Sequence, residues 1–260
     1  MSPKQAVLVT GASSGIGAVY ADRFARRGHD LVLVARDRSR MESLADRLHR
    51  DTGVRVDVLQ ADLTDEADLA RVERRLREDT SIGVLVNNAG ALLRGSFLDQ
   101  SGGDIAGLIA LNVTSLTRLA NAIAPRLAAA GAGAIVNLGS IVGLAPEIGL
   151  TVYGATKAFA LFLTQGLALE LGPKGVYVQA VLPAATRTEI WARSGRDVDT
   201  LPGVMEVGEL VDAALVGFDR RELVTIPPLQ DTGQWESFAA ARQAMLPNFF
   251  QEHPAARYRT

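Results

Sequence analysis

Short runs rich in valine, leucine and isoleucine recur along the chain, and helical patterns separate them. Several runs are apolar at consecutive positions, which is typical of strands that helices cover on both sides. Between the first two, IGAVYADRFARRG places Ile16, Tyr20 and Phe24 four residues apart and stops at Gly28, as an amphipathic helix does. The alternation recurs about six times and predicts an α/β fold with a doubly wound parallel sheet of about seven strands. The runs are AVLV from Ala6, LVLVA from Leu31, VRVDVL from Val54, VLVNN from Val84, AIVNLGS from Ala134, VYVQAVLP from Val176 and LVTIPP from Leu223.

Length and composition limit the classes of protein to which such a sheet can belong. A chain of 260 residues, 48% of them apolar and without a linker-like tract, fits one α/β domain. The net charge of −2 supplies no positive field for nucleic acid or an anionic membrane. The absence of cysteine excludes disulfides, thiolate metal sites and cysteine nucleophiles. With no signal-peptide core and no apolar stretch of about 18 uncharged residues, we expect a soluble, cytoplasmic protein without a metal.

A glycine-rich turn, TGASSGIG, follows the first strand. Gly11, Gly15 and Gly17 let the backbone come close to a bound group, and the free N–H groups of the helix start favour a negative charge such as a pyrophosphate. No Lys-Ser/Thr pair follows the last glycine, so the turn is not a P-loop. The simpler interpretation is a turn that uses glycine only to pack a helix on a strand.

The end of the second strand indicates which dinucleotide the turn binds. An acidic residue there accepts hydrogen bonds from the ribose of NAD, whereas an arginine accommodates the 2′-phosphate of NADP. The strand ends LVLVARDRSR, with Ala35 at the expected acidic position and Arg36 directly after it. Asp37 would lie near the ribose if the strand ended one residue later. We favour NADP(H), because the arginine fork suits a phosphate.

Polar residues follow the other strands at the same predicted edge. Each has an ordinary explanation on its own, such as a helix start at Asp62 or a turn at Asn88 and Gly90. Their shared edge gives them a common site. They are Asp62, the NNAG stretch from Asn87 to Gly90, Ser140, Pro183, Thr186 and Thr188.

Tyr153 and Lys157 lie one helical turn apart in the helix expected after Ser140. A nearby ammonium favours the phenolate and lowers the pKa of a tyrosine from about 10, so the pair can act as a general acid or base. Ser140 would hold a substrate oxygen against the phenol. Asn112 would order a water that relays protons to Lys157, or would be a buried polar residue whose own neighbours satisfy it.

The ordered set of motifs resembles the short-chain dehydrogenase/reductase family over nearly the whole chain up to the last strand. The set is TGASSGIG, Asp62, NNAG, Asn112, Ser140, YGATK from Tyr153 to Lys157, and the proline turn at Pro183. The resemblance implies a single Rossmann-type domain with a catalytic tetrad of Asn112, Ser140, Tyr153 and Lys157. In it, Tyr153 would donate a proton to a carbonyl oxygen while NADPH delivers hydride to the carbon, and the reverse direction would use Tyr153 as base.

The resemblance also implies the residues that bind the cofactor. Lys157 would hold the nicotinamide ribose, Asp62 would contact adenine, and Thr188 would anchor the carboxamide. The predicted cofactor-binding set comprises Gly11, Ser13, Ser14, Gly15, Ile16, Gly17, Arg36, Asp62, Leu63, Asn88, Ala89, Gly90, Tyr153, Lys157, Pro183, Thr186 and Thr188.

The chain departs from the family pattern in two places. Ala184 stands where the family usually has glycine, and residues 231–260 replace the family's frequent C-terminal ending. We therefore expect a binding and catalytic domain over residues 1–230 and a helical extension over residues 231–260, packed on the same domain or on a partner subunit. The extension carries Trp235, Phe238, Phe249 and Phe250.

The residues expected around the reacting carbon are mostly apolar and suggest a ketone or aldehyde, or its alcohol. Arg94 or Arg187 would be needed for an anionic substrate. The leading hypothesis is an NADP(H)-dependent carbonyl reductase or alcohol dehydrogenase; the alternatives are a 3-oxoacyl thioester reductase and a catalytically idle NADP(H)-binding regulatory protein. The resemblance also implies a homodimer or homotetramer built on helices within residues 105–129 and 152–171, and apolar helix faces such as AFALFLTQGLALEL give this some support. The apolar set is Leu92, Leu93, Ile141, Val142, Leu144, Ile190 and Trp191.

Overall fold

The computed structural model describes residues 4–195 and 197–259, and its seven strands form one parallel sheet. The spatial order is β3-β2-β1-β4-β5-β6-β7, and every neighbouring pair is parallel. Each apolar run of the sequence contains one strand, which confirms the predicted fold class. The strands are β1 (Ala6–Thr10), β2 (Leu31–Ala35), β3 (Val56–Gln60), β4 (Ile82–Asn87), β5 (Ala134–Leu138), β6 (Tyr177–Val181) and β7 (Val224–Thr225).

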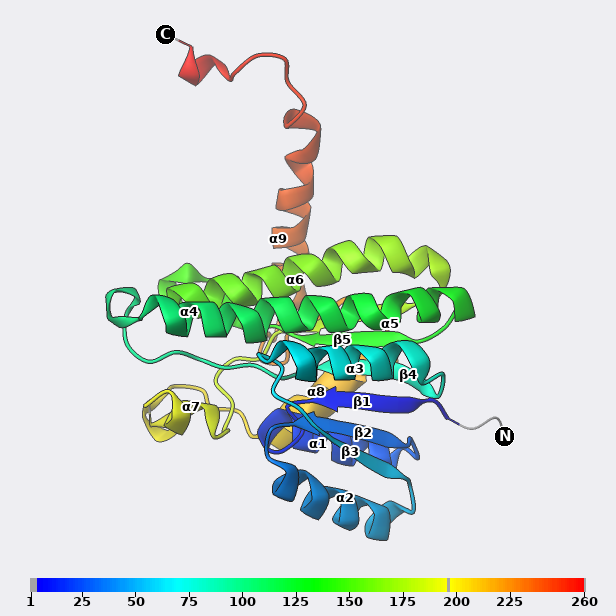
Figure 1. Ribbon diagram of the computed structural model, residues 1–260. Helices are drawn as coiled ribbons and strands as arrows, with labels where there is room; N and C mark the ends of the chain where they lie inside the picture. The colour runs from blue at the N-terminus through cyan, green and yellow to red at the C-terminus, as the bar shows by residue number, and fades with distance from the viewer. Residues whose placement is uncertain (1–3, 196, 260) are drawn as a thin grey trace. The chain divides into compact units, whose positions relative to one another are not determined.

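Helices cover both faces of this sheet (Figure 1). Helices α1, α2 and α8 share one apolar core with the strands, and α3, α5 and α6 share the other. Because β1, β2, β4 and β5 are buried along their whole length, they need apolar residues at consecutive positions. The helices of the domain are α1 (Gly15–Arg26), α2 (Arg38–Thr52), α3 (Glu66–Glu78), α4 (Gly102–Ile109), α5 (Leu116–Ala130), α6 (Thr151–Leu171), α7 (Ile190–Arg193) and α8 (Val207–Asp219).

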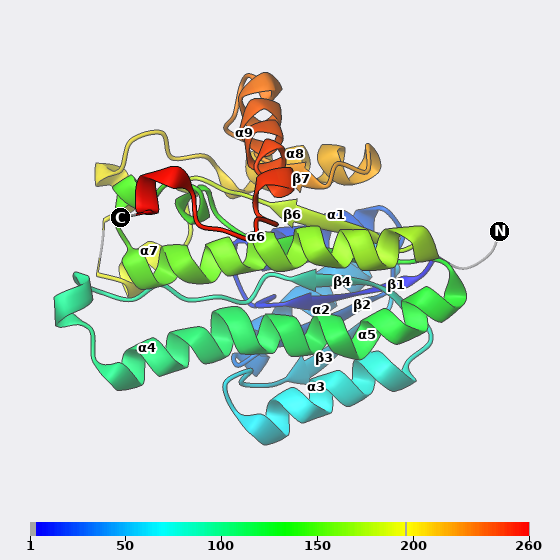
Figure 2. The ribbon, with the colours of Figure 1, turned by 90° about the horizontal axis from the view of Figure 1, so that it is seen from above.

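The strand order reverses between β1 and β4. From β1 the chain proceeds outward through β2 and β3, and it then returns to build β4 to β7 on the other side of β1. Connections that leave two neighbouring strands in opposite directions open a crevice at their carboxyl ends. Figure 2 shows the parallel strands beneath α4, α5 and α6 from above. The topology therefore places a binding crevice where the glycine turn and the NNAG stretch begin.

The long helix expected over residues 105–129 is interrupted. A π-helical segment, Ala110–Ser115, separates α4 from α5 and contains the buried Asn112. The Ser115 hydroxyl donates to the Leu111 carbonyl, and such a widened turn is a frequent feature of functional sites. The hydrophobic pattern predicts the helix but not its widened turn, because one extra residue in a turn barely changes the apolar periodicity.

The chain divides into two compact units, Met1–Pro227 and Pro228–Thr260. The second unit contains α9 (Thr232–Ala244). Asp231 caps the start of this helix, and its carboxylate accepts from the Gly233 N–H. Trp235 and Phe238 contact each other within this helix, with ring centroids 5.5 Å apart. All residues of α9 are described, and none is buried.

No helix in residues 4–195 or 197–259 combines the length and the apolar character needed to cross a membrane. The same part of the chain holds no cluster of three or more histidine, aspartate or glutamate side chains arranged to bind a metal ion.

Candidate active site

The glycine turn packs tightly against the end of β4. Asn88 donates from its side chain to the carbonyls of Thr10 (2.8 Å) and Gly11 (3.3 Å), and its own N–H donates to the Thr10 hydroxyl (3.0 Å). Gly11 has a φ of 66°, and a Cβ on Gly17 would collide with the Gly11 carbonyl oxygen. These contacts require glycine at both positions and fix the start of α1 beside β4. The packing role that the sequence allows for these glycines is thus present in the structure.

Asp37, the alternative that the sequence leaves open at the end of β2, lines the cavity together with Arg36. The strand ends at Ala35, and Asp37 caps α2 by accepting from the Arg40 N–H at 3.0 Å. Its other carboxylate oxygen lies 3.4 Å from Arg40 Nε. Arg36 lies next to Asp62, with Nη1 and Oδ2 3.8 Å apart, and both line the main cavity. The Asp37 carboxylate is thus engaged with its own helix, while the Arg36 guanidinium faces the cavity.

Tyr153 and Lys157 are presented by the first turns of α6. Lys157 is 6% exposed, and its ammonium donates to the Leu138 carbonyl at 2.8 Å. Its Nζ lies 5.6 Å from the centre of the Tyr153 ring. Ser140 is buried at the end of β5, where its hydroxyl accepts from the Val142 N–H at 3.2 Å. The helix and the strand end thus bring the three predicted side chains together.

Burial dominates the protonation of this group. It raises the pKa of Tyr153 to about 12, and a hydrogen bond with Ser140 opposes that rise. Burial also lowers the pKa of Lys157 to about 8. The net shift for Tyr153 is upward, whereas the sequence interpretation expects its pKa to fall beside the lysine. The two differ because the sequence shows how the tyrosine and the lysine are spaced, but it does not show how strongly each is buried in the folded protein. Tyr153 is consequently a protonated phenol at neutral pH.

Asn112 is fully engaged with the protein. Its Oδ1 accepts from the Ala91 N–H (3.0 Å), and its Nδ2 donates to the Ala91 carbonyl (3.1 Å) and to the Thr156 hydroxyl (3.1 Å). This is the simpler of the two sequence interpretations, a buried amide satisfied by its neighbours. A Cβ on Gly90 would lie 3.3 Å from Asn112 Oδ1 and 3.5 Å from Lys157 Nζ. Gly90 therefore leaves space between the asparagine and the lysine.

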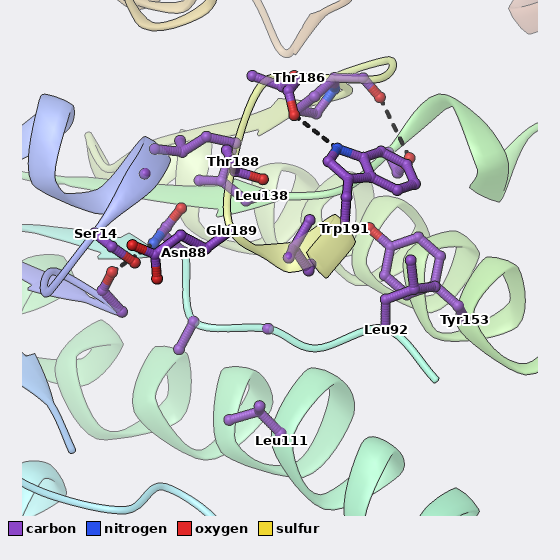
Figure 3. A pocket seen from close by; sticks show the side chains of 18 of the residues that line it. Ser14, Asn88, Leu92, Leu111, Leu138, Tyr153, Thr186, Thr188, Glu189 and Trp191 are labelled. Atoms are coloured by element: carbon purple, nitrogen blue, oxygen red, sulfur yellow. Dashed lines mark hydrogen bonds between the residues drawn. The ribbon is translucent and has the colours of Figure 1, made fainter. Parts of the chain in front are cut away.

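One cavity of about 940 Å³ contains most of these residues. In Figure 3, Ser14 and Asn88 lie on one side of the view, and Tyr153, Trp191 and Leu92 lie on the other. Trp191 is fixed by the indole N–H, which donates to the Thr186 carbonyl at 2.7 Å (Figure 3). Thr188 approaches the glycine turn, since a Cβ on Gly15 would lie 3.3 Å from its methyl group. The cavity thus joins the glycine turn to the tyrosine.

The predicted residues and the cavity overlap with a few exceptions. Of the catalytic and cofactor-binding predictions, Gly17 and Asn112 lie behind the lining. Of the apolar predictions, Leu93 and Leu144 do not line the cavity, although Leu92 and Val142 do. Asp37, which the sequence analysis considers only as an alternative, also lines the cavity. Lining residues that the sequence analysis missed include Arg40, Thr64, Leu111, Ile148, Leu150, Glu189, Leu201 and Pro202.

Neither arginine considered for an anionic substrate lines this cavity. Arg187 is paired with Asp199 and with Glu206, the latter at 2.8 Å. Arg94 lies against Gly195, whose Cβ would be 3.4 Å from the arginine Nε. The ion pairs of Arg187 were not predictable, because their partners lie in a segment with no regular pattern.

Comparison with known proteins decides the family. A model of the short chain dehydrogenase family matches residues 5–199. The chain belongs to the short-chain dehydrogenase family. It is accordingly an oxidoreductase, and the resemblance derived from the motifs is confirmed.

Two solved structures of this family are similar over nearly the whole chain. A short-chain dehydrogenase from Sphingobium yanoikuyae in complex with NADPH is 65% identical, with a TM-score of 0.97 over 98% of this chain and 100% of that one. A bulky-bulky ketone specific alcohol dehydrogenase from Comamonas testosteroni is 59% identical, with a TM-score of 0.93 over 100% of both chains. Both similarities extend beyond the residues that the family model matches.

A curated relative is more distant. The 17-beta-hydroxysteroid dehydrogenase type 3 of Rattus norvegicus is 34% identical over 187 residues, which are 71% of this chain and 60% of that protein. The chain thus spans about 60% of the length of this relative.

Proposed function

We propose that this short-chain dehydrogenase interconverts ketones that carry bulky apolar groups with their alcohols, using NADP(H). One observation carries the proposal. Tyr153, next to Ser140 and one turn from the buried Lys157, shares a cavity with apolar side chains and with the glycine turn. A phenol that stays protonated at neutral pH, held beside an apolar pocket, suits proton donation to a carbonyl oxygen.

The residues of the cavity fit an NADP(H) molecule. Gly11 and the start of α1 would hold the pyrophosphate, because Gly11 and Gly15 line the cavity where the N–H groups of the helix start favour a negative charge. Arg36 would hold the 2′-phosphate, since the Asp37 carboxylate is engaged by α2. The 65% identical relative in complex with NADPH supports NADP(H) as the cofactor of this chain.

Each catalytic side chain then has one task. Bound NADPH supplies the hydride. Ser140 orients the substrate oxygen, and Tyr153 donates its proton to that oxygen. The Lys157 ammonium offsets the negative charge that develops on the tyrosine oxygen as the proton leaves. A water in the space beside Gly90 and Asn112 would then relay a proton through Lys157 back to Tyr153.

The apolar part of the cavity supports a substrate with large groups on both sides of the carbonyl. Arg94 and Arg187, the two arginines considered for an anionic substrate, lie outside the lining. The similarity to a bulky-bulky ketone specific enzyme supports the same substrate class. The apolar lining comprises Leu92, Ile141, Val142, Ile148, Leu150, Ile190, Trp191 and Leu201.

A substrate series tests this proposal. Purified protein is assayed by NADPH and NADH absorbance with ketones of increasing size on one side and then on both, and with a 3-oxoacyl thioester. We expect turnover with NADPH to be highest for ketones that are large on both sides. Highest turnover with the thioester would favour the second enzyme hypothesis, and NADPH binding without turnover of any carbonyl would favour a regulatory protein.

We also propose that the chain forms a homodimer or homotetramer. The support is an outward-facing apolar surface on α6, where Phe162 and Leu169 are 76% and 81% exposed.

The unit from Pro228 to Thr260 would pack on its own domain or on a partner subunit, because a helix without a buried residue gains little stability alone. Light scattering of the intact chain is the test, and a monomer at assay concentration would refute the proposal.

A further inference from the structure

A buried threonine lies between the π-helical segment and the first turns of α6. Thr156 directly precedes Lys157 and is 3% exposed. Its hydroxyl donates to the Tyr153 carbonyl at 2.7 Å and accepts from Asn112 Nδ2 at 3.1 Å. Thr156 does not line the cavity. Its side chain therefore joins the π-helical segment to the turn of α6 that carries Tyr153 and Lys157, outside the space that substrate and cofactor would occupy.

The other hydrogen bonds of the Asn112 amide lead to the segment after β4. Its Oδ1 accepts from the Ala91 N–H at 3.0 Å, and its Nδ2 donates to the Ala91 carbonyl at 3.1 Å. An amide nitrogen has two N–H donors, so one is used by the Ala91 carbonyl and the other by the Thr156 hydroxyl. Without the threonine hydroxyl, Asn112 would stay tied to Ala91 but would lose its hydrogen bond to α6.

Asn112 and Lys157 face the same small space. A Cβ on Gly90 would lie 3.3 Å from Asn112 Oδ1 and 3.5 Å from Lys157 Nζ. Because Thr156 and Lys157 are neighbours in the chain, the hydrogen bond to Thr156 sets the position of Asn112 relative to Lys157. A bridging water needs both of its partners within hydrogen-bonding reach, so a relay through this space depends on its width.

We propose that Thr156 is a positioning residue for the return of a proton to Tyr153. Its hydroxyl holds Asn112 at a fixed separation from Lys157, so that a water between them reaches both. This inference rests on the proposed ketone reduction, in which Tyr153 gives one proton to the ketone oxygen in each turnover and regains one from solvent. Thr156 gives no proton to the substrate, because its hydroxyl donates to the Tyr153 carbonyl.

Thr164, about two turns further along α6, offers a matched control. Its hydroxyl donates to the Ala160 carbonyl at 2.6 Å and accepts from Asn137 Nδ2 at 2.9 Å, and the residue is fully buried. Thr164 thus repeats the hydrogen bonds of Thr156. Its asparagine, however, lies in β5 and does not line the cavity. Replacing either threonine by valine removes equivalent hydrogen bonds, and only the change at Thr156 affects the space beside Lys157.

The test compares Thr156→Val, Thr156→Ser and Thr164→Val in steady-state ketone reduction with NADPH. We expect Thr156→Val to lower kcat about tenfold and to leave KM within about twofold, since the hydroxyl lies outside the substrate pocket. Thr156→Ser keeps the hydroxyl and should keep kcat within about threefold of the wild-type value. Thr164→Val should keep the wild-type kcat. Both valine variants should lower the melting temperature by about 3–6 °C, because each leaves a buried amide N–H without a partner.

The solvent deuterium isotope effect on kcat distinguishes a positioning role from a loss of folded protein. Slower proton return makes that step more rate-limiting, so the isotope effect of Thr156→Val in heavy water should exceed that of the wild type. A loss of folded molecules would lower kcat and leave the isotope effect unchanged. An unchanged isotope effect would therefore contradict the positioning role.

The kinetic outcomes separate this inference from the proposed function. If the wild type reduces ketones and Thr156→Val keeps its kcat, the positioning role is wrong and the proposed function stands. The same conclusion follows if Thr156→Ser is as slow as Thr156→Val, or if Thr164→Val loses as much kcat as Thr156→Val. A wild-type protein that reduces no carbonyl compound would refute both.

Discussion

Burial raises the pKa of Tyr20, of Tyr153 and of Tyr177, and a comparison of the first two is instructive because only Tyr153 lines the cavity. Tyr20 of α1 is 1% exposed and stacks on Phe24, and its hydroxyl has no hydrogen-bond partner among the described residues. Burial raises its pKa far above the usual value. The pKa of Tyr153 of α6 is raised less, to about 12, and Tyr153 lines a cavity together with Ser140 and Lys157.

The difference shows that a shifted pKa does not identify a catalytic acid. Loss of solvent shifts both phenols, and only the surroundings of Tyr153 can orient a substrate oxygen and compensate a phenolate. The two residues therefore form an internal pair of test and control, in which the same substitution removes the same hydroxyl.

The largest effect is expected for Tyr153→Phe. Removing the acid should lower kcat for ketone reduction by about 10²–10⁴-fold, the range of general acid catalysis. NADPH binding, measured by fluorescence titration, should stay within about twofold, because the cofactor is held mainly by other groups. A variant that keeps wild-type turnover would exclude Tyr153 as the proton donor.

Ser140→Ala should have a smaller but still large effect. The hydroxyl orients the substrate oxygen, and loss of one such donor typically lowers kcat by about 10²-fold. Steady-state kinetics with the best ketone of the series measure this loss. An increase in KM at constant kcat would instead assign Ser140 to ground-state binding only.

Tyr20→Phe should leave turnover unchanged and raise stability. An unpaired buried hydroxyl costs about 1–3 kcal/mol, so its removal should raise the free energy of unfolding by about 1 kcal/mol after some loss of packing. Urea unfolding, with the activity assay alongside, measures both quantities. Destabilisation by more than about 1 kcal/mol would mean that the hydroxyl has a partner in solution, such as a buried water.

Local patterns made the sheet predictable, together with most of the residues that line the cavity at its edge. Apolar runs predict every strand, and the order of glycine turn, NNAG, Ser140 and YGATK predicts which residues meet. The remainder depends on contacts between distant segments. The pairing of Arg40 with Glu189 and the π-helical turn at Asn112 leave no periodic signal, and the upward pKa shift of Tyr153 follows from burial that only packing reveals.

Leu92 and Leu93 illustrate the limit for the substrate pocket. They are adjacent and chemically identical, yet only Leu92 lines the cavity. The sequence predicts that this segment lies near the substrate. Which of its side chains points into the cavity depends on the path of the backbone after β4.

The pH dependence of both reaction directions tests the central claim most directly. With a pKa of about 12, Tyr153 stays protonated, and Lys157, with a pKa of about 8, carries its ammonium charge below that pH. The value of kcat/KM for ketone reduction should therefore be constant up to about pH 8 and fall above it, whereas alcohol oxidation, which needs the phenolate, should accelerate as pH rises. A reduction rate that increases with pH would contradict Tyr153 as the acid.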